Sequence, residues 1–213
     1  DAVARGELRV GPGAASSSKP PVFYDVGANG GHYSFLSKGL FGDRIVVVAF
    51  EPTPDTARWL EAINDVNRLG IKTERIALSN ATGEVTLYLS AKSDSSNSLN
   101  ATFKGVHRGT LQVPCATLDQ YVAESGLVPS LLKIDTETHE EFVLRGGEKL
   151  LRETRPFLIV EVIRKHGHDY GKAVTNYLEE VGGYHYYHIG QKGALKRRQR
   201  ISVKKHMAYA RDW

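Results

Sequence analysis

The sequence predicts an α/β fold in which helices cover both faces of a mostly parallel sheet. Short apolar runs alternate with helical patterns along the chain, as in successive strand–helix–strand units. The runs at 45–50 (IVVVAF) and 157–162 (FLIVEV) are largely apolar and β-branched, as expected for strands that are buried on both faces. The 213 residues are enough for one such domain.

The expected elements follow one another in order. Residues 1–20 are rich in Gly, Ala and Ser and predict a flexible arm, and the domain is expected to span 21–190. Pro54 suits the first turn of a helix in which Trp59, Ile63 and Val66 are expected to face the core. Further helices are expected at 32–38, after 139 and at 169–181, and strands at 22–26, 45–50, 73–79, 84–90, 111–115, 131–135, 157–162, 184–189 and 201–209.

The positive charge of the protein is concentrated at its C-terminal end. The whole chain carries +4, and residues 191–213 contain eight Lys or Arg and one Asp, which leaves −3 for the rest. This basic segment is expected to contribute the last strand. A solvated tail is the simpler interpretation of its charge, and a phosphate-binding or membrane-surface patch is the alternative. Because no aromatic residues interleave with the basic ones at 196–200, no nucleic-acid partner is expected.

The composition also bears on where in the cell the protein is expected. No apolar run approaches the roughly 20 residues that span a bilayer, so no membrane span is expected. The single cysteine, Cys115, excludes an intramolecular disulfide framework and favours a reducing compartment. Since no basic region followed by an apolar one opens the sequence, we expect a cytoplasmic protein, or one whose targeting segment has been removed. The sequence does not determine the oligomeric state.

The ends of the expected strands carry polar residues or glycine. In parallel sheets of this kind, ligands bind outside the carboxyl ends of the strands, where the strand order reverses. The residues expected at that edge are 25–31, Glu51, Ser79, 135–139 and Glu161. The sequence therefore predicts a ligand site along this edge.

The glycine loop after the first strand (DVGANGGHYS, 25–34) does not match a phosphate-binding motif. Counted from Gly27, a G-x-G-x-x-G motif would need glycine where Asn29 and His32 stand, and no Gly-Lys-Ser/Thr follows. Asp25 would repel a pyrophosphate and suit an ammonium group. Glu51, at the end of the next strand, can accept both hydroxyls of a ribose. A phosphate-free ligand with a ribose and a cationic amino-acid end is S-adenosylmethionine.

Three segments in order then resemble one family: DVGANGGHYS, AFEP at 49–52 and KIDTETHEEFVLRGG at 133–147. The chain is similar to FkbM-family S-adenosylmethionine-dependent methyltransferases, which show a D-x-G-A-N-x-G-x-Y-S loop, an FEP strand end and a K-I-D-x-E-G-x-E segment. The resemblance covers about two-thirds of the chain, residues 23–162. It implies a Rossmann-like class I methyltransferase with a seven-stranded, mostly parallel sheet. It also implies O-methylation of a sugar or small-molecule hydroxyl, so that the partner is a glycan or small-molecule acceptor.

The residues expected to bind the cofactor lie in the glycine loop and at the next strand ends. They are Asp25, Gly27, Ala28, Asn29, Gly31, Tyr33, Ser34, Glu51, Pro52, Ser79 and Asp135. Helix capping is the alternative role of Glu51, and a left-handed turn is that of Asn29. Tyr33 and Ser34 could instead simply begin the helix.

Four titratable residues are the catalytic candidates: Asp135, Glu137, His139 and Glu161. A hydroxyl acceptor needs a base, and the pKa range of His139 suits one. Asp135 could instead cap a helix, and His139 could be a surface or capping residue. Glu161 lies inside an apolar strand pattern, where a buried acid needs a partner.

Other features leave alternatives open. Thr138 stands where the family usually has glycine, so a positive φ there would cost conformational energy or reshape the turn. The polar loop at 91–110, which includes SDSSNSL at 93–99, is either an acceptor-site lid or a flexible segment. His166 and His168 lack further metal ligands at suitable spacing, so no metal is expected. The functional alternatives are a cofactor-binding but catalytically weak module whose basic tail recognises a partner, and a nicotinamide oxidoreductase, which the broken glycine motif disfavours.

Overall fold

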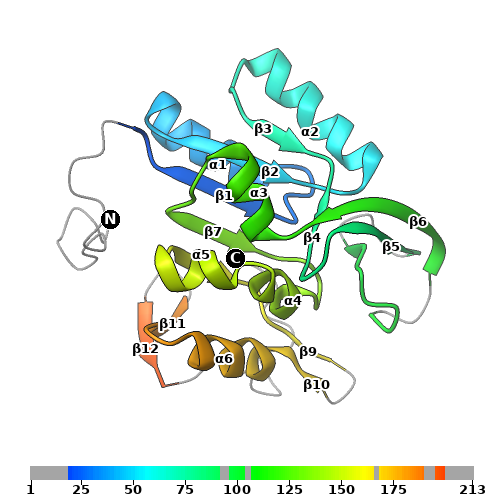
Figure 1. The fold of residues 1–213 in the computed structure, drawn as a ribbon. Helices are drawn as coiled ribbons and strands as arrows, with labels where there is room; N and C mark the ends of the chain where they lie inside the picture. Colours follow the sequence, from blue (N-terminus) through cyan, green and yellow to red (C-terminus); the bar gives the residue numbers. More distant parts are fainter. Residues whose placement is uncertain (1–18, 92–95, 104–106, 166–167, 190–194, 200–213) are drawn as a thin grey trace.

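The computed structural model describes residues 19–91, 96–103, 107–165, 168–189 and 195–199. Strands and helices alternate through most of it, as the sequence predicts (Figure 1). The strands are β1 (Val22–Val26), β2 (Val46–Phe50), β3 (Lys72–Glu74), β4 (Ala77–Leu78), β5 (Gly83–Ser90), β6 (His107–Ala116), β7 (Leu131–Ile134), β8 (Phe157–Val160), β9 (Arg164–Lys165), β10 (His168–Asp169), β11 (Tyr186–Ile189) and β12 (Leu195–Arg198). The helices are α1 (His32–Phe41), the 3₁₀ turn η1 (Gly42–Arg44), α2 (Pro54–Asn67), α3 (Leu118–Ser125), α4 (Glu140–Arg145), α5 (Glu148–Glu153) and α6 (Tyr170–Val181).

The main sheet has five parallel strands in the order β3-β2-β1-β7-β8. From β1 the chain builds outward through β2 to β3, and it later returns to the other side of β1 as β7 and β8. The strand order therefore reverses between β1 and β7. After β1 the chain crosses to one side of the sheet, and after β7 it crosses to the other. The two connections therefore separate at the carboxyl ends of these strands, and a ligand crevice is expected between them.

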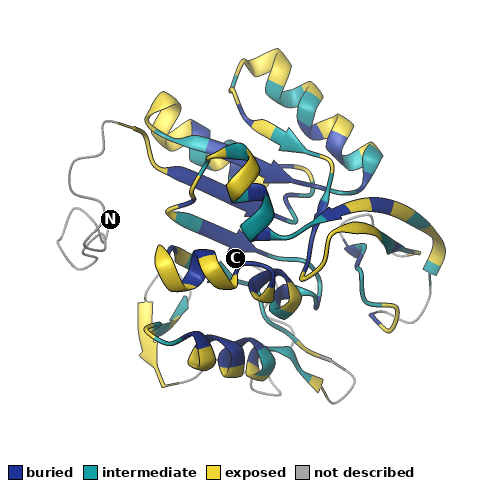
Figure 2. Ribbon diagram, in the orientation of Figure 1, coloured by how far each residue is buried: buried dark blue, intermediate teal, exposed yellow. Residues whose placement is uncertain are grey.

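Each face of the main sheet packs against its own helices (Figure 2). On one face, Tyr24 and Val26 of β1 belong to a cluster with residues of α3, α4, α5 and α6. On the other face, Phe23 packs with Leu60 of α2, and Tyr33 and Phe35 of α1 lie against the same cluster. The alternation along β1 fits a strand buried on both sides, and the predicted class of fold is confirmed.

The prediction of seven strands in one sheet is not confirmed by the described residues. The segment expected as one strand at 73–79 divides into β3, which joins the main sheet, and β4, which joins β6 and β5 in a second sheet. The physical reason is pairing: Ala77 and Leu78 lie opposite Cys115 and Ala116 at the edge of the long β5–β6 hairpin. Apolar patterning predicts strands but does not say which sheet they join.

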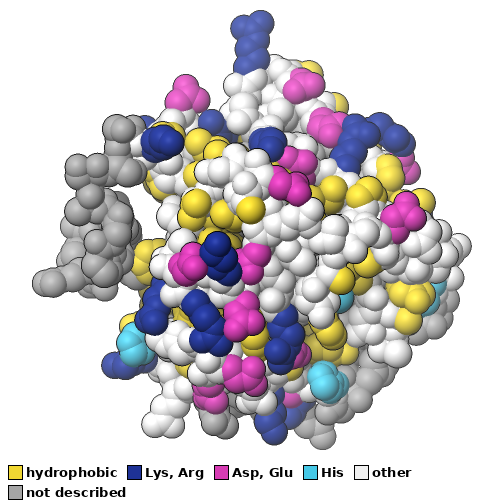
Figure 3. All heavy atoms as spheres, in the orientation of Figure 1, with side chains coloured by type: hydrophobic (Ala, Val, Ile, Leu, Met, Phe, Trp, Pro, Cys, Tyr) yellow, Lys and Arg dark blue, Asp and Glu magenta, His cyan; other side chains and the backbone are white. Residues whose placement is uncertain are grey.

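The C-terminal strands also differ from the prediction. β11 pairs with β12 in a separate two-stranded antiparallel sheet. The strand expected at 201–209 lies outside the described residues, as do 1–18 of the expected N-terminal arm. The basic residues of β12 are exposed. On the face drawn in Figure 3, Lys and Arg side chains of the described residues stand among Asp and Glu side chains, so the charge there is mixed.

In α2 the inward face was assigned wrongly. Trp59 is 70% exposed and Val66 is 83% exposed, whereas Ala57 and Leu60 are buried. Ile63, the third residue predicted to face inward, is half-buried. Asn64, one turn after Leu60, is also half-buried, and its side chain accepts a hydrogen bond from Ile71 N at 2.9 Å. Because a polar residue continues the inward face, a purely apolar pattern does not locate it. Among the described helices, none is both long enough and apolar enough to cross a bilayer.

Candidate active site

The glycine loop between β1 and α1 is held against the ends of two neighbouring strands. Gly27, Asn29 and Gly31 have positive φ values of 70°, 49° and 84°. Gly27 N donates a hydrogen bond to Phe50 O at 3.1 Å. A Cβ added to Gly27 would lie 1.9 Å from the main-chain oxygen of Asp135. The close approach that requires glycine here is therefore made by the end of β7, within the protein itself.

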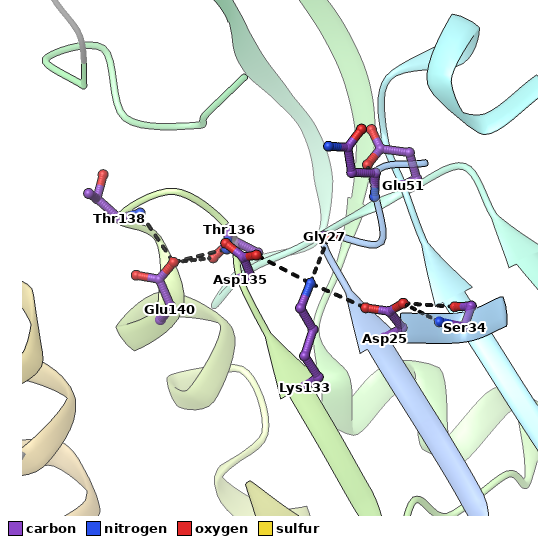
Figure 4. Close-up of polar contacts among 10 residues, drawn as sticks. Asp25, Gly27, Ser34, Glu51, Lys133, Asp135, Thr136, Thr138 and Glu140 are labelled. Carbon is purple, nitrogen blue, oxygen red and sulfur yellow. Dashed lines mark hydrogen bonds and ion pairs between the residues drawn. The ribbon is translucent and has the colours of Figure 1, made fainter. Parts of the chain in front are cut away.

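Lys133 connects the loop to the sheet (Figure 4). Its Nζ donates a hydrogen bond to Gly27 O at 2.9 Å and lies 3.3 Å from Asp25 Oδ1 and 3.5 Å from Asp135 Oδ2. Burial disfavours its charge, but the two carboxylates outweigh burial and raise the pKa of Lys133. A buried ammonium thus joins both strands at the point where the strand order reverses.

Asp25 lies beneath the glycine loop and does not line the pocket. It is fully buried, and Oδ2 accepts hydrogen bonds from Ser34 N at 3.1 Å and Ser34 Oγ at 2.8 Å. Because the N-cap residue of α1 is Gly31, no N-cap side chain accepts a hydrogen bond from the first turn. The Asp25 carboxylate accepts one from that turn instead. Its position is suited to shaping the loop, whereas the sequence suggested contact with an ammonium group of a ligand.

A pocket of about 90 Å³ opens at the carboxyl ends of β1, β2 and β7. It brings together seven of the sequence-predicted residues: Gly27, Asn29, Glu51, Pro52, Asp135, Glu137 and His139. The other seven lie outside its lining: Asp25, Ala28, Gly31, Tyr33, Ser34, Ser79 and Glu161. Three carboxylates and no Lys or Arg are found among the described residues that line it.

Glu51 lies at the floor of this pocket. Its Oε1 accepts a hydrogen bond from Thr53 N at 2.8 Å, and its Oε2 accepts one from Asn29 N at 2.8 Å. Burial raises the pKa of Glu51. The Thr53 side chain also hydrogen-bonds to this carboxylate. An ionised carboxylate offers about four lone-pair positions, so one position is left for a ligand hydroxyl. The N-cap residue of α2 is Thr53 rather than Glu51, and Glu51 accepts a hydrogen bond from the main-chain N of that residue.

His139 forms one wall of the pocket. Its Nε2 lies 2.8 Å from Ser79 Oγ, and its ring stacks on Phe142 with centroids 4.7 Å apart. Burial lowers the pKa of His139 to about 4, so the imidazole is neutral at pH 7. Ser79 therefore reaches the site through His139.

The turn between β7 and α4 contains two non-glycine residues in left-handed conformation. Glu137 has φ +54° and Thr138 has φ +82°. Glu140 Oε1 accepts hydrogen bonds from Thr136 N at 2.9 Å, Thr136 Oγ1 at 3.2 Å and Thr138 N at 3.1 Å. Thr138, which stands where the family usually has glycine, therefore adopts a positive φ, the condition under which the sequence predicts a conformational cost or a reshaped turn.

Glu140 and Lys133 are the main structural residues of the site that sequence reasoning did not single out. Glu140 is buried, and burial raises its pKa to about 7. Both residues belong to the KIDTETHE segment, whose charged residues at the end of an apolar strand were the available signal. Their hydrogen-bond partners depend on the conformation of the turn between β7 and α4, which the sequence pattern does not specify.

The described part of the long polar loop covers the pocket. Asn97 Nδ2 donates to Thr53 Oγ1 at 3.3 Å, and Ser98 Oγ donates to Glu137 O at 2.7 Å. Asn100 Nδ2 donates to Thr138 Oγ1 at 2.9 Å and to Tyr170 OH at 3.1 Å. Residues 96–103 thus bridge the strand ends. Of SDSSNSL, residues 93–95 lie outside the described residues.

Glu161 differs from its predicted setting. β8 ends at Val160, so Glu161 follows the strand and is only half-buried. Its main-chain N donates to Ile134 O at 3.0 Å. Apolar patterning extended the strand by two residues because Val162 also packs against the core.

A second cavity of about 510 Å³ lies beside the first, and Leu99 and His139 line both. It is bounded by 99–101, the start of α4 and the β10–α6 junction. Among the described residues, no three His, Cys, Asp or Glu side chains are grouped closely enough to hold a metal ion. His166 of the H-x-H sequence lies outside the described residues.

Comparison with known proteins identifies the family. Residues 25–186 match the family model of the methyltransferase FkbM domain. The hexuronic acid methyltransferase AglP of Haloferax volcanii is 32% identical over 162 residues, which are 75% of this chain and 62% of that protein. The chain therefore spans about three-fifths of the length of this relative.

A solved structure shares the fold. The crystal structure of methyltransferase FkbM from Methylobacillus flagellatus KT matches with a TM-score of 0.54 and 17% identity, covering 83% of this chain and 41% of that one. At this identity the similarity shows the fold alone, and the family rests on the match across 25–186. On that match, the chain belongs to the FkbM methyltransferase family.

Proposed function

We propose that this protein is an S-adenosylmethionine-dependent methyltransferase that methylates a sugar or small-molecule hydroxyl. The observation that carries the proposal is the pocket at the reversal of strand order, lined by Glu51, Asp135 and Glu137 without Lys or Arg among its described residues. This set of groups fits a cationic, ribose-bearing, phosphate-free cofactor. The family and the name of the Haloferax volcanii relative support methyl transfer to a sugar.

Glu51 would accept a hydrogen bond from a ribose hydroxyl at the lone-pair position that Thr53 and Asn29 leave open. Asp135 and Glu137, whose side chains line the same pocket, would stabilise positive charge near the end of β7. The cofactor supplies an activated methyl group on a sulfonium. The protein's task is then to align the acceptor oxygen with that methyl group, which can lower the barrier by several kcal/mol.

The pocket of about 90 Å³ is smaller than the roughly 300–1,000 Å³ of small-molecule sites. Entry of the whole cofactor therefore requires the covering segment to move. The hydrogen bond between Asn97 and Thr53 is 3.3 Å long and joins this segment to the start of α2. We expect Asn97→Ala to speed cofactor association, because the variant loses this bond and the one that Asn97 Oδ1 accepts from Ser90 N at 2.9 Å.

His139 is the base that the geometry favours. Its imidazole is neutral at pH 7 and lies where the two cavities meet. A ring with a pKa of about 4 accepts a proton weakly, so the bond to Ser79 would have to stabilise the proton as it arrives. We expect His139→Asn to lower kcat at least tenfold while cofactor affinity changes little.

Calorimetric titration tests cofactor choice. We expect S-adenosylmethionine to bind and NAD not to bind, and the reverse result would overturn the proposal. Glu51→Ala should weaken cofactor binding about tenfold or more, because a charged acceptor in a buried site contributes ~1.5–3 kcal/mol. Glu148→Ala, on the exposed side of α5, is the matched control.

Turnover tests the reaction. Release of S-adenosylhomocysteine across a panel of glycosides and small-molecule alcohols should identify an accepted hydroxyl. Cofactor binding without turnover on any member of the panel would favour the alternative function, a cofactor-binding module that recognises a partner.

A further inference from the structure

The cavity of about 510 Å³ beside the cofactor pocket has the size of a small-molecule site. It shares His139 and Leu99 with that pocket. An acceptor in this cavity would therefore face the cofactor pocket across His139, the proposed base. None of the cofactor-binding residues predicted from the sequence lines it.

The lining combines polar groups with aromatic rings. Asn100 Nδ2 donates to Tyr170 OH, and the Tyr170 ring packs edge-on against His168 with centroids 4.5 Å apart. Phe142, which is 42% exposed, presents a ring beside His139. Hydroxyl, amide and carboxylate groups can exchange hydrogen bonds with several hydroxyls, while ring faces suit the C–H surfaces of a pyranose.

The lining contains two glutamates and two histidines. Glu140 and Glu141 line the cavity, and its described lining residues include no Lys or Arg. Glu141 pairs with Arg145 at 2.9 Å, but Arg145 is not among the lining residues, and its guanidinium lies 4.5 Å from the centre of the Tyr177 ring. A carboxylate on an acceptor would lose water here and would meet no Lys or Arg among the described lining residues, which is costly.

We propose that this cavity is the acceptor subsite and that it selects an uncharged hexopyranoside over a hexuronic acid, with Tyr170 and Asn100 orienting the sugar. This inference rests on the proposed function, in which the methyl group is transferred to an acceptor hydroxyl. The proposed acceptor is uncharged, whereas the name of the Haloferax volcanii relative states a hexuronic acid. We assign the selectivity to the absence of Lys and Arg among the described lining residues rather than to the shape of the cavity.

The test is equilibrium binding, which does not depend on turnover. Methyl glucopyranoside, methyl galactopyranoside and the corresponding methyl uronosides are titrated into the full chain with saturating S-adenosylhomocysteine, and binding is followed by saturation-transfer NMR. We expect at least one neutral glycoside to bind at least fivefold tighter than its uronoside. Tyr170→Phe should weaken that binding severalfold, whereas Tyr187→Phe, on β11 and half exposed, should not.

A gain-of-function variant tests the charge argument. Ala101 is exposed and lines the cavity, so Ala101→Lys adds a cation without removing a side-chain contact. We expect uronoside binding to tighten at least fivefold in this variant. Ala123→Lys, on the exposed side of α3, should leave it unchanged.

The outcomes separate the two proposals. Tighter uronoside binding by the parent protein, or neutral binding that survives Tyr170→Phe, would overturn the subsite assignment. A protein that binds S-adenosylmethionine but none of these sugars would refute the subsite and leave the proposed function standing. Sugar binding that depends on Tyr170 in a protein without cofactor affinity would refute the function alone.

Discussion

Lys133 Nζ donates a hydrogen bond to the main-chain oxygen of Gly27 at 2.9 Å, from a side chain that is almost completely buried between β1 and β7. In the parallel register Lys133 lies opposite Asp25, and the two side chains form an ion pair at 3.3 Å. One cation thus holds the glycine loop, β1 and β7 together beneath the proposed cofactor pocket.

Replacing Lys133 by Met should destabilise the protein by ~3–5 kcal/mol, because it leaves the buried Asp25 carboxylate without its cation. Urea denaturation measures the change. The double variant Lys133→Met with Asp25→Asn should recover part of the loss, since the buried charge is then gone. A single variant as stable as the parent would show that the ammonium does not hold the loop.

Gly27→Ala should be far more harmful than Gly30→Ala. At Gly27 φ is +70° and an added Cβ would lie 1.9 Å from Asp135 O, whereas nothing lies within 4 Å of a Cβ at Gly30. Backbone strain alone costs ~1–3 kcal/mol, and the clash adds to it. Thermal unfolding and cofactor titration of both variants check this, and equal losses would contradict the assigned loop geometry.

Thr138→Gly should be more stable than Thr138→Ala by ~1–2 kcal/mol, because only glycine adopts φ +82° without strain. Both variants lose the hydroxyl that accepts from Asn100, so this contribution cancels. Thr154 is the matched control: its φ is −106° and its hydroxyl donates to Leu150 O. At this position Thr154→Ala should be more stable than Thr154→Gly. Denaturation midpoints of the four variants show whether the order of Ala and Gly is reversed between positions 138 and 154.

Glu140→Gln should remove part of the pH dependence of stability. Burial raises the pKa of Glu140 from an ordinary 4.5 to about 7, so its stabilising contribution is complete below pH 4.5 and is lost as the pH rises through 7. The amide does not ionise, and its oxygen can still accept from Thr136 and Thr138. The variant should therefore gain up to ~3 kcal/mol on the parent between pH 5 and pH 8.

Denaturation at several pH values measures this difference, with Glu148→Gln as the control because Glu148 is an exposed glutamate paired with Arg152. Parallel pH curves for Glu140→Gln and the parent would mean that the buried carboxyl ionises as an ordinary glutamate does.

Local patterns in the sequence predicted most of the fold. The apolar runs at β1, β2, β7 and β8 and the glycine loop are local features, since burial on both faces and positive φ values leave direct traces in residue type. Glu51 at a strand end and the FkbM resemblance followed from the same patterns. The face of α2 that packs on the sheet was only partly predicted, because the half-buried Asn64 continues it with a polar residue.

The partners of the charged residues could not be predicted in this way. Whether Asp25 faces a ligand or Lys133 depends on the register between β1 and β7, whose residues are more than a hundred positions apart. The same holds for β4, which joins the second sheet through pairing with β6. Asn100 reaches Thr138 and Tyr170 only because three distant segments meet.

The sequence by itself determined the class of fold, the family and the edge of the sheet where a ligand site should lie, because periodicity, strand-end polarity and short motifs are encoded locally. Only the tertiary structure decided that the glycine loop is closed by Asp135 and Lys133, that Glu140 orders the strained turn, and that a second cavity adjoins the first at His139. Those features arise from contacts between residues far apart in the chain, and their geometry depends on strand register and on the direction of each turn.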